Sequence, residues 1–209
     1  MKLFKLAPIV AALAITAAPV AAEEVNGLTY NRAGIGYGSA SINGASDDGV
    51  SIDGDASGVG IELQAVVAEN FVLGFGYIKQ DGDLTARSVK FDFENTDMSL
   101  TFGYRFGVAQ GTDVVPFLRY TNSDGKLNGQ SVDDNTTTYG LRLNTRLSET
   151  AQATIGFRTD GKDDEFGKAF DVGLLFKVQP TVGLGLGYTL INSDSNDVKT
   201  WTATVEYLF

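Results

Sequence analysis

Apolar and polar residues alternate with a period of two along most of the chain, which is the pattern of β-strands with two unlike faces. In the run from 98 to 108, bulky apolar residues occupy the even positions, and Ser, Thr, Gly and Arg occupy the odd ones. The pattern predicts an all-β protein of ten strands, of which the first is the least regular. Runs of this kind lie near 28–42, 58–67, 71–77, 98–108, 114–121, 139–147, 153–158, 170–178, 182–190 and 201–209.

The two faces of these runs differ in a way that favours a membrane barrel over a soluble β-sandwich. The apolar faces carry no charge, as a lipid-facing surface requires. Many glycines fall on the opposite face, as at 183, 185 and 187. Glycine weakens a strand that faces water, but it suits the narrow interior of a small barrel. We therefore expect a closed antiparallel up-and-down transmembrane β-barrel with small and charged residues inside.

The connections between the runs alternate in length, as they do in transmembrane barrels with short turns at one end and longer loops at the other. Ten strands give the even count that closure needs, and eight strands remain the alternative if the hairpin 151–178 is misread. The short links lie near 69–70, 110–111, 148–149 and 179–180, and the longer polar segments span about 43–56, 81–95, 122–135, 160–168 and 193–197.

The segment 86–97 departs from the regular pattern. Val89, Phe91 and Phe93 alternate with their neighbours, but their parity differs from that of the run starting at Met98. A bulge inserts one residue into a strand and reverses the faces beyond it. We therefore interpret this segment as a bulged strand that extends beyond the membrane.

The first 22 residues are typical of a secretory signal. Two lysines, Lys2 and Lys5, precede an apolar run from 7 to 18, and the small residues 19–22 suit cleavage before Glu23. The apolar run is shorter than the ~20 residues that span a bilayer. We expect residues 1–22 to be a signal peptide and residues 23–209 to form the barrel domain.

The last nine residues carry a second targeting signal. An aromatic residue ends the chain, and apolar or aromatic residues occupy every second position before it. This segment resembles the C-terminal assembly signal of bacterial outer-membrane proteins, and the chain as a whole resembles the small outer-membrane barrels that include the outer-membrane protein A barrel and the opacity-type adhesins. The residues that carry the assembly signal are Trp201, Ala203, Val205, Tyr207 and Phe209.

The resemblance implies a location and a route of assembly. The protein is expected in the outer membrane of a Gram-negative bacterium after export and signal cleavage, in contact with lipid and lipopolysaccharide, and handled during biogenesis by periplasmic chaperones and the barrel assembly machinery. Function is not implied, because this superfamily includes adhesins, narrow porins, structural barrels and enzymes.

Composition narrows the functional classes. The formal net charge is -10, which argues against nucleic acid as a partner. The chain has no Cys and no His, so it lacks a thiol nucleophile and the base on which outer-membrane hydrolases, as families, generally rely. We expect no catalytic site, no cofactor and no metal site.

Several charged residues fall on the inward face. They predict either a buried network of ion pairs that fills the lumen or an arginine-lined constriction that favours anions. We favour the network, because barrels of about eight strands are usually packed with side chains. The residues are Glu62, Arg105, Arg119, Arg142, Arg146, Arg158, Asp171, Lys177 and Glu206.

The predicted outer loops are strongly acidic, with carboxylates such as Asp47, Asp48, Asp81, Asp83 and Asp163. No spacing matches a known calcium loop, so a solvated surface is the interpretation we prefer to a divalent-cation site that bridges lipopolysaccharide. The pattern favours a non-enzymatic scaffold that presents acidic extracellular loops to a possible partner. The alternative is a narrow porin-like channel for ions or small solutes.

Overall fold

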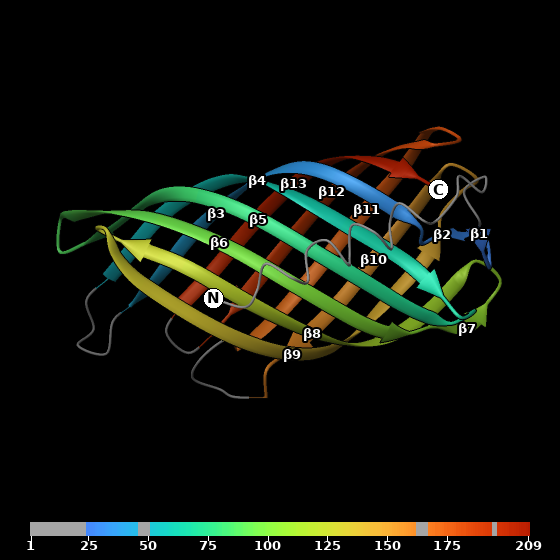
Figure 1. Cartoon of the computed structure of the whole chain (residues 1–209), viewed down its shortest axis with the longest axis horizontal. Helices are drawn as coiled ribbons and strands as arrows, with labels where there is room; N and C mark the ends of the chain where they lie inside the picture. The colour runs from blue at the N-terminus through green and yellow to red at the C-terminus, as the bar shows by residue number, and fades with distance from the viewer. Residues whose placement is uncertain (1–23, 46–50, 162–166, 194–195) are drawn as a thin grey trace, which may run out of the picture.

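The structure is a computed structural model that describes residues 24–45, 51–161, 167–193 and 196–209. Within these ranges the chain forms a closed antiparallel β-barrel, in which consecutive strands pair and the first strand pairs with the last (Figure 1). No described helix is long and apolar enough to cross a membrane. The predicted signal 1–22 lies outside the described residues.

The barrel strands confirm the expectation of ten rather than eight. The long strand β6 and the short strand β7 are parts of one barrel strand interrupted at Arg105, because both pair with β8. The barrel elements are β3 (Arg32–Ala45), β4 (Ser51–Val67), β5 (Phe71–Ala86), β6 (Val89–Tyr104), β7 (Phe106–Ala109), β8 (Thr112–Leu127), β9 (Gln130–Arg146), β10 (Ala151–Thr159), β11 (Lys168–Gln179), β12 (Val182–Asn192) and β13 (Asn196–Leu208).

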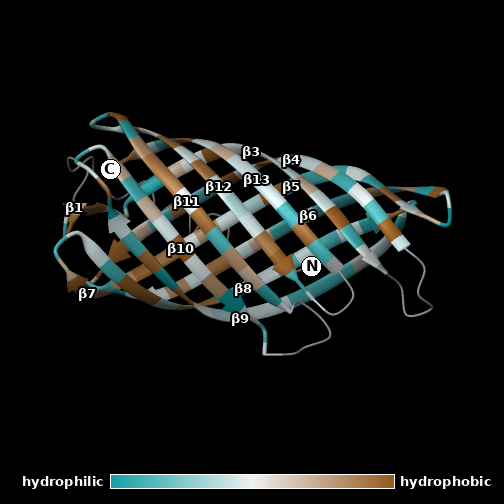
Figure 2. Ribbon diagram, turned by 180° about the vertical axis from the view of Figure 1, so that it is seen from behind, coloured by the Kyte–Doolittle hydropathy of each residue, from teal (hydrophilic) through white to brown (hydrophobic). Residues whose placement is uncertain are grey.

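The sidedness of the strands is the one that the alternation predicts. Phe102 and Leu186 are 54% and 55% exposed on the outside, whereas Gly103 and Gly185 are buried inside. Figure 2 shows the resulting alternation of hydrophobic and hydrophilic residues along the strands. The apolar residues form the outer surface because that surface of a membrane barrel contacts hydrocarbon rather than water.

The strands differ in length, and this makes one side of the barrel taller than the other. β4, β5, β6, β8 and β9 have 16 or 17 residues, whereas β10 to β13 have 9 to 13. We call the loop-end parts of the five long strands, residues 51–57, 79–97 and 121–138, the projecting wall.

The projecting wall corrects the prediction of long loops at 81–95 and 122–135. Both segments are β-hairpins closed by two-residue turns, Arg87-Ser88 and Asn128-Gly129. All four turn residues have positive φ, from 49° to 78°, as two-residue hairpins with the right-handed strand twist require. Polar composition suggested loops, but the hairpin pairing extends through them.

The predicted bulge in 86–97 is also wrong. The β5–β6 ladder runs from Phe71↔Tyr104 to Ala86↔Val89 without a register shift. The parity changes because the environment changes along β6. From Met98 to Tyr104, towards the short-turn end, the apolar residues face lipid, whereas Phe91 and Phe93, nearer the loop end, lie on the inner face of the projecting wall. A change of parity therefore marks the level at which this strand leaves the membrane.

The first predicted strand, near 28–42, begins too early. The barrel strand β3 starts at Arg32, and Leu28–Thr29 instead forms strand β2, which pairs with β1 (Glu24–Val25). This small hairpin lies at the end of the barrel that carries the short turns and the C-terminus (Figure 1). We call residues 24–30 the plug.

Candidate functional site in the barrel lumen

The plug fills the lumen at the short-turn end. Leu28, Thr29 and Tyr30 are 0 to 1% exposed, although they belong to no barrel strand. Leu28 and Tyr30 form an apolar cluster with Val72 and Val115, which point inward from β5 and β8. These side chains are shielded from water, so the plug packs closely against the inner face of the barrel at this level.

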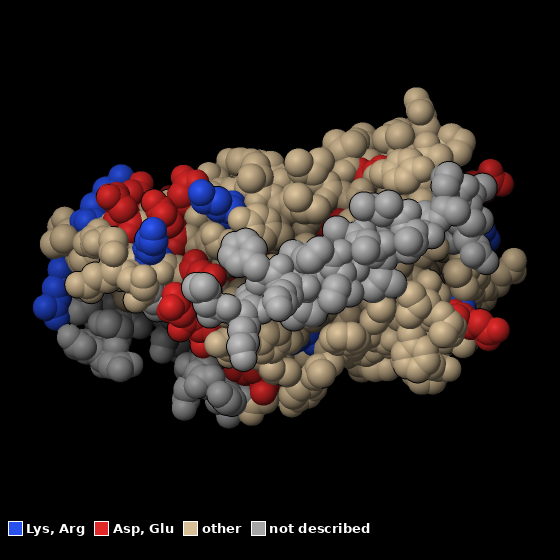
Figure 3. Space-filling model, viewed as in Figure 1, with Lys and Arg blue, Asp and Glu red and all other residues tan. Residues whose placement is uncertain are grey.

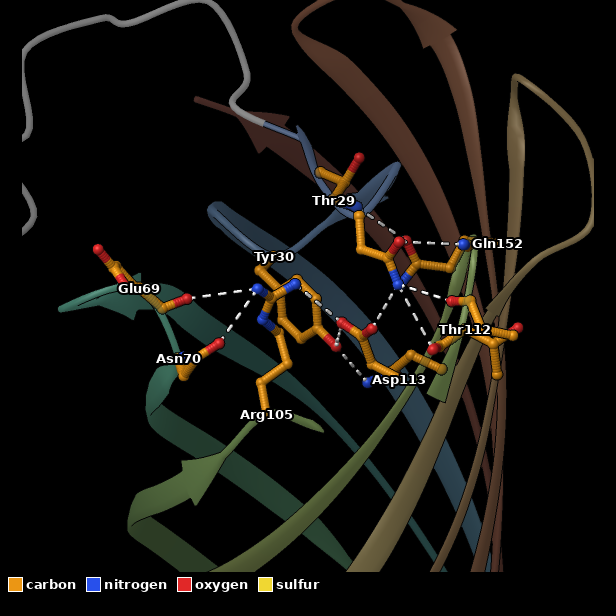
Figure 4. Close-up of polar contacts among 12 residues, drawn as sticks. Thr29, Tyr30, Glu69, Asn70, Arg105, Thr112, Asp113 and Gln152 are labelled. Carbon is orange, nitrogen blue, oxygen red and sulfur yellow. Dashed lines mark hydrogen bonds and ion pairs between the residues drawn. The ribbon is translucent and has the colours of Figure 1, made fainter. Parts of the chain in front are cut away.

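A buried carboxylate ties the plug to the barrel wall (Figure 4). Asp113, on β8, is fully buried and accepts hydrogen bonds from the Tyr30 hydroxyl at 3.0 Å, from Arg105 Nη1 at 3.0 Å and from Asn26 Nδ2 at 2.7 Å. Asn144 donates to the Tyr30 oxygen at 3.1 Å. A buried charge with this many partners is stable, whereas one that loses them is strongly destabilising.

Tyr30 precedes the first membrane-spanning strand, and its surroundings favour the neutral phenol. Burial, reinforced by the nearby Asp113 carboxylate, raises the pKa of Tyr30 well above its ordinary value. Tyr30 therefore remains a hydrogen-bond donor to Asp113 throughout the physiological pH range.

Further hydrogen bonds fix the plug to strands around the barrel. Gln152, on β10, accepts the Thr29 backbone N–H at 3.0 Å. Gln64, on β4, donates to the Tyr30 carbonyl at 3.2 Å, and Asn31 accepts the Val66 N–H at 2.8 Å. Because these partners come from opposite sides of the barrel, the segment crosses the lumen.

A cavity of about 200 Å³ lies above the plug. It extends from Gln64 and Val72, which contact the plug, towards Ala40 and Gln80 on the loop side. One wall of the cavity is smooth because the inward positions of three neighbouring strands are mostly glycine. These glycines are Gly34, Gly36 and Gly38 on β3, Gly58 and Gly60 on β4, and Gly74 and Gly76 on β5.

Two arginines reach into this cavity from the opposite wall. Arg119 of β8 donates from Nη2 to Ser99 Oγ at 2.9 Å, and Arg142 of β9 donates from Nη1 to Gln64 Oε1 at 3.3 Å. The Arg142 guanidinium also lies 5.2 Å from the centre of the Phe117 ring. Among the described residues, neither arginine forms an ion pair with a carboxylate.

The other charges at this level are paired. Arg158 lies 3.3 Å from Asp171, which also accepts a hydrogen bond from Thr189 at 2.8 Å. Arg32 lies 3.3 Å from Glu206 and 3.9 Å from Glu62. Glu62 is the most open of the three carboxylates, with 56% of its side chain exposed, and it lines the cavity beside Arg119 and Arg142.

A match to a known family identifies the kind of closed barrel that this chain forms. The model of the outer membrane protein beta-barrel domain family matches residues 8–209. The chain belongs to this family. No functionally curated protein matches the sequence.

Solved structures similar to this outer-membrane barrel include domains of two autotransporters. The translocator domain of the autotransporter NalP from Neisseria meningitidis is 14% identical, with 97% of this chain and 96% of that one covered and a TM-score of 0.57. The transport unit of the autotransporter AIDA-I from Escherichia coli is 9% identical, with 96% of this chain and 97% of that one covered and a TM-score of 0.54. At these identities the similarity shows the barrel fold alone.

The lumen of this outer-membrane barrel receives the inward charges that the alternation selected. Glu62, Arg119 and Arg142 share the cavity, Arg158 meets Asp171, and Glu206 meets Arg32. Arg105 is separated from them and belongs to the plug contacts. Two of the nine lie elsewhere: the Arg146 guanidinium is beside Gly27 of the plug, and Lys177 is near the short-turn end opposite Gly183.

Sequence reasoning missed the residues that hold the plug. Asp113 is on the inward face opposite Val114, so parity alone was enough to select it with the other lumen charges. Asn26 and Tyr30 offered no such signal, because residues 24–30 do not alternate. Arg32 lies within the predicted first strand and has the inward parity of Gly34, so the same alternation could have selected it.

The acidic side chains of the projecting wall form no metal centre. Within the described ranges, no group of three or more Asp or Glu residues is arranged to hold a metal ion. The acidic residues Asp47, Asp48, Asp163, Asp164, Glu165 and Asp194 lie outside those ranges.

Proposed function

We propose that this protein is a non-enzymatic surface scaffold of the outer membrane, whose lumen is closed and whose projecting wall faces the exterior. The plug is the observation that carries this proposal. A barrel filled across one end by buried Leu28 and Tyr30, and tied there by the Asp113 contacts, is built for rigidity rather than for passage. Family barrels place the short turns in the periplasm, so the plug would lie on that side.

The outer face of the projecting wall is the surface that we propose for interaction. Charged side chains gather at the loop end of the barrel, with a largely uncharged band between the ends (Figure 3). Directly opposite one another in the ladders are like charges: Asp55 and Asp83, Asp83 and Asp92, and Asp124 and Asp133. Such pairs destabilise a sheet. Their presence on exposed strands supports a partner that presents positive charge.

A narrow porin is the second candidate, and it is favoured by the guanidinium groups of Arg119 and Arg142, which form no ion pair with the described carboxylates. For conduction the plug would have to leave the lumen, which would expose Leu28 and unpair Asp113. The two functions therefore make opposite predictions for the intact protein.

Planar-bilayer conductance of the refolded mature protein tests the proposal. The intact barrel is expected to be silent. A variant lacking residues 24–30 is expected to give steady single-channel steps that Arg142→Ala alters, because the cavity would then open at both ends. Steady steps from the intact protein would refute the scaffold and establish the porin.

A binding experiment tests the wall separately. Micelles carrying the protein are titrated with oligolysine at physiological salt, and the wall variant Asp92→Asn/Asp133→Asn is compared with the control variant Glu69→Gln/Glu149→Gln, which removes two exposed carboxylates at the short-turn end. The wall variant is expected to bind more weakly than the control variant. Equal binding by the two would contradict a role for the wall.

We further propose cleavage of the signal before Glu23 and insertion by the barrel assembly machinery, with Phe209 completing the assembly signal. The outward positions of Trp201, Val205 and Tyr207 on β13 support this role. N-terminal sequencing of the outer-membrane fraction tests the cleavage site, and Phe209→Ala is expected to lower the amount of inserted protein. A mature chain that begins elsewhere would overturn the first part.

A further inference from the structure

We propose that the cavity above the plug is a blind binding pocket for a small oxyanion, either phosphate or sulfate or a small molecule that carries such a group. The pocket is formed by Arg119 and Arg142 on one side and by the glycine-lined strands β3, β4 and β5 on the other. Its floor is the plug, and its remaining lining residues lead towards the loop end.

The first argument is the number of unused donors. A guanidinium carries five N–H donors in a planar fork that matches the oxygens of phosphate or sulfate. Arg119 and Arg142 each make one hydrogen bond to protein in the described part of the chain, to Ser99 and to Gln64. Arg119 Nε is buried without a hydrogen-bond partner, and the remaining Nη donors of the two arginines can meet water or a ligand within the cavity.

The second argument is the balance of charge. Around the cavity, the inward arginines of the described strands are Arg32, Arg119, Arg142 and Arg158, and the inward carboxylates are Glu62, Asp97, Asp171 and Glu206. Asp171 and Glu206 are engaged by Arg158 and Arg32. Asp97, two positions beyond Ser99 on the same face of β6, accepts hydrogen bonds from Asn95 and Ser123. Among the described residues that line the cavity, Glu62 is therefore the one carboxylate beside the two guanidinium groups, and its closest cation is Arg32 rather than either of them.

The third argument is space. A cavity of about 200 Å³ is far larger than the ~10–15 Å³ that one water molecule needs by this type of measure. The glycine wall creates that space, and several of its positions allow no larger residue. A Cβ on Gly36 would lie 2.7 Å from the backbone carbonyl oxygen of Ala203, and one on Gly58 would lie 2.2 Å from that of Lys79. The ligand would therefore lie against a flat backbone surface with the two guanidinium groups opposite.

Glu62 is the competitor for the same arginines, and this gives the proposal its sharpest test. If the pocket binds an anion, removing the Glu62 carboxylate should tighten binding, while removing either guanidinium should weaken it. If the cavity holds only water and the arginines serve to fill the lumen, Glu62 should make no difference.

The experiment is isothermal titration calorimetry of the full mature barrel in zwitterionic detergent, with sodium sulfate and sodium phosphate as probes and sodium chloride as the reference salt. Arg119→Gln and Arg142→Gln are each expected to weaken sulfate binding about tenfold or more, as the loss of charge-assisted hydrogen bonds predicts. Glu62→Gln is expected to strengthen it. The matched control is Lys90→Gln, which removes one exposed positive charge on the projecting wall and should change nothing.

A cold-detergent gel shift, compared before and after boiling, first verifies that each variant is folded. Repeating the titration in micelles that contain phosphatidylglycerol distinguishes a free anion from a lipid headgroup as the natural source: unchanged affinity assigns the site to free anions, and competition assigns it to a headgroup. Absence of saturable sulfate binding, or equal binding by Arg119→Gln and the intact protein, would overturn the proposal. An equal loss in Lys90→Gln would overturn it as well.

Discussion

The hydroxyl of Tyr30 donates a hydrogen bond of 3.0 Å to the carboxylate of Asp113, although the two residues are 83 positions apart in the chain. Tyr30 belongs to the plug, outside the barrel strands, and Asp113 belongs to the barrel strand β8. Their contact therefore fixes a local hairpin inside a structure otherwise held by strand pairing. Arg105 and Asn26 donate to the same carboxylate, so three side chains depend on Asp113.

Asp113→Ala is expected to cost about 3–5 kcal/mol of stability, because Arg105 is left as a buried charge without its carboxylate. The free energy of unfolding in urea, measured in lipid vesicles, gives the magnitude. Asp124→Ala removes an exposed carboxylate from the projecting wall and is the control, with an expected change within about 0.5 kcal/mol.

The same variant should also loosen the plug, and this effect is separable from stability. Protease cleavage within residues 24–30 is expected to be faster in Asp113→Ala than in the intact protein, while the boiled and unboiled gel positions still differ. If the plug stayed protected, then the apolar contacts of Leu28 alone would hold it.

Alkaline pH is expected to weaken the plug through Tyr30. The folded protein keeps the phenol proton to a higher pH than the unfolded chain, because burial and Asp113 raise its pKa. Stability from this residue is therefore complete below about pH 10, the ordinary pKa of Tyr, and falls as the pH rises above it. The free energy of unfolding, measured from about pH 8 to about pH 11, gives the size of the effect, because this range brackets the ordinary pKa of tyrosine.

Tyr30→Phe is the control for this pH dependence. It removes the titrating group but keeps the ring against Val72 and Val115. The variant should be less stable at neutral pH, since Asp113 loses a donor, but the part of the alkaline decline due to Tyr30 should vanish. An identical decline in both proteins would assign it to other groups.

The fold was predictable from the sequence because lipid selects one simple alternation. Phe102 outside and Gly103 inside follow directly from parity, and so do the inward positions of Arg119 and Arg142. The plug was not predictable, because its partners Gln64, Asp113 and Gln152 are brought to it only by barrel closure. The Asn128-Gly129 turn was a readable hairpin signal, and the acidic composition around it concealed that signal.

The turns of the projecting wall offer a paired test of backbone strain. Ser88 has a φ of 65°, which glycine adopts more easily, so Ser88→Gly is expected to stabilise its hairpin by about 1 kcal/mol. Gly129 has a φ of 78° with open space around it, so Gly129→Ala is expected to cost a similar amount through its backbone alone. Hydrogen exchange of the β5–β6 and β8–β9 amides measures both, and shifts of the same sign would contradict the argument.

The outward face of β12 gives the most direct test of the membrane assignment. Leu186 is 55% exposed, and its ladder partners Leu174 and Ala203 are also outside. Leu186→Arg is expected to destabilise the barrel in phospholipid vesicles by about 2–4 kcal/mol, because the charge must enter hydrocarbon. Val89→Arg introduces the same charge at an exposed position beside the Arg87-Ser88 turn and is expected to cost little. Equal costs for the two variants would mean that Leu186 does not face lipid, and the membrane-spanning level of the barrel would have to be reassigned.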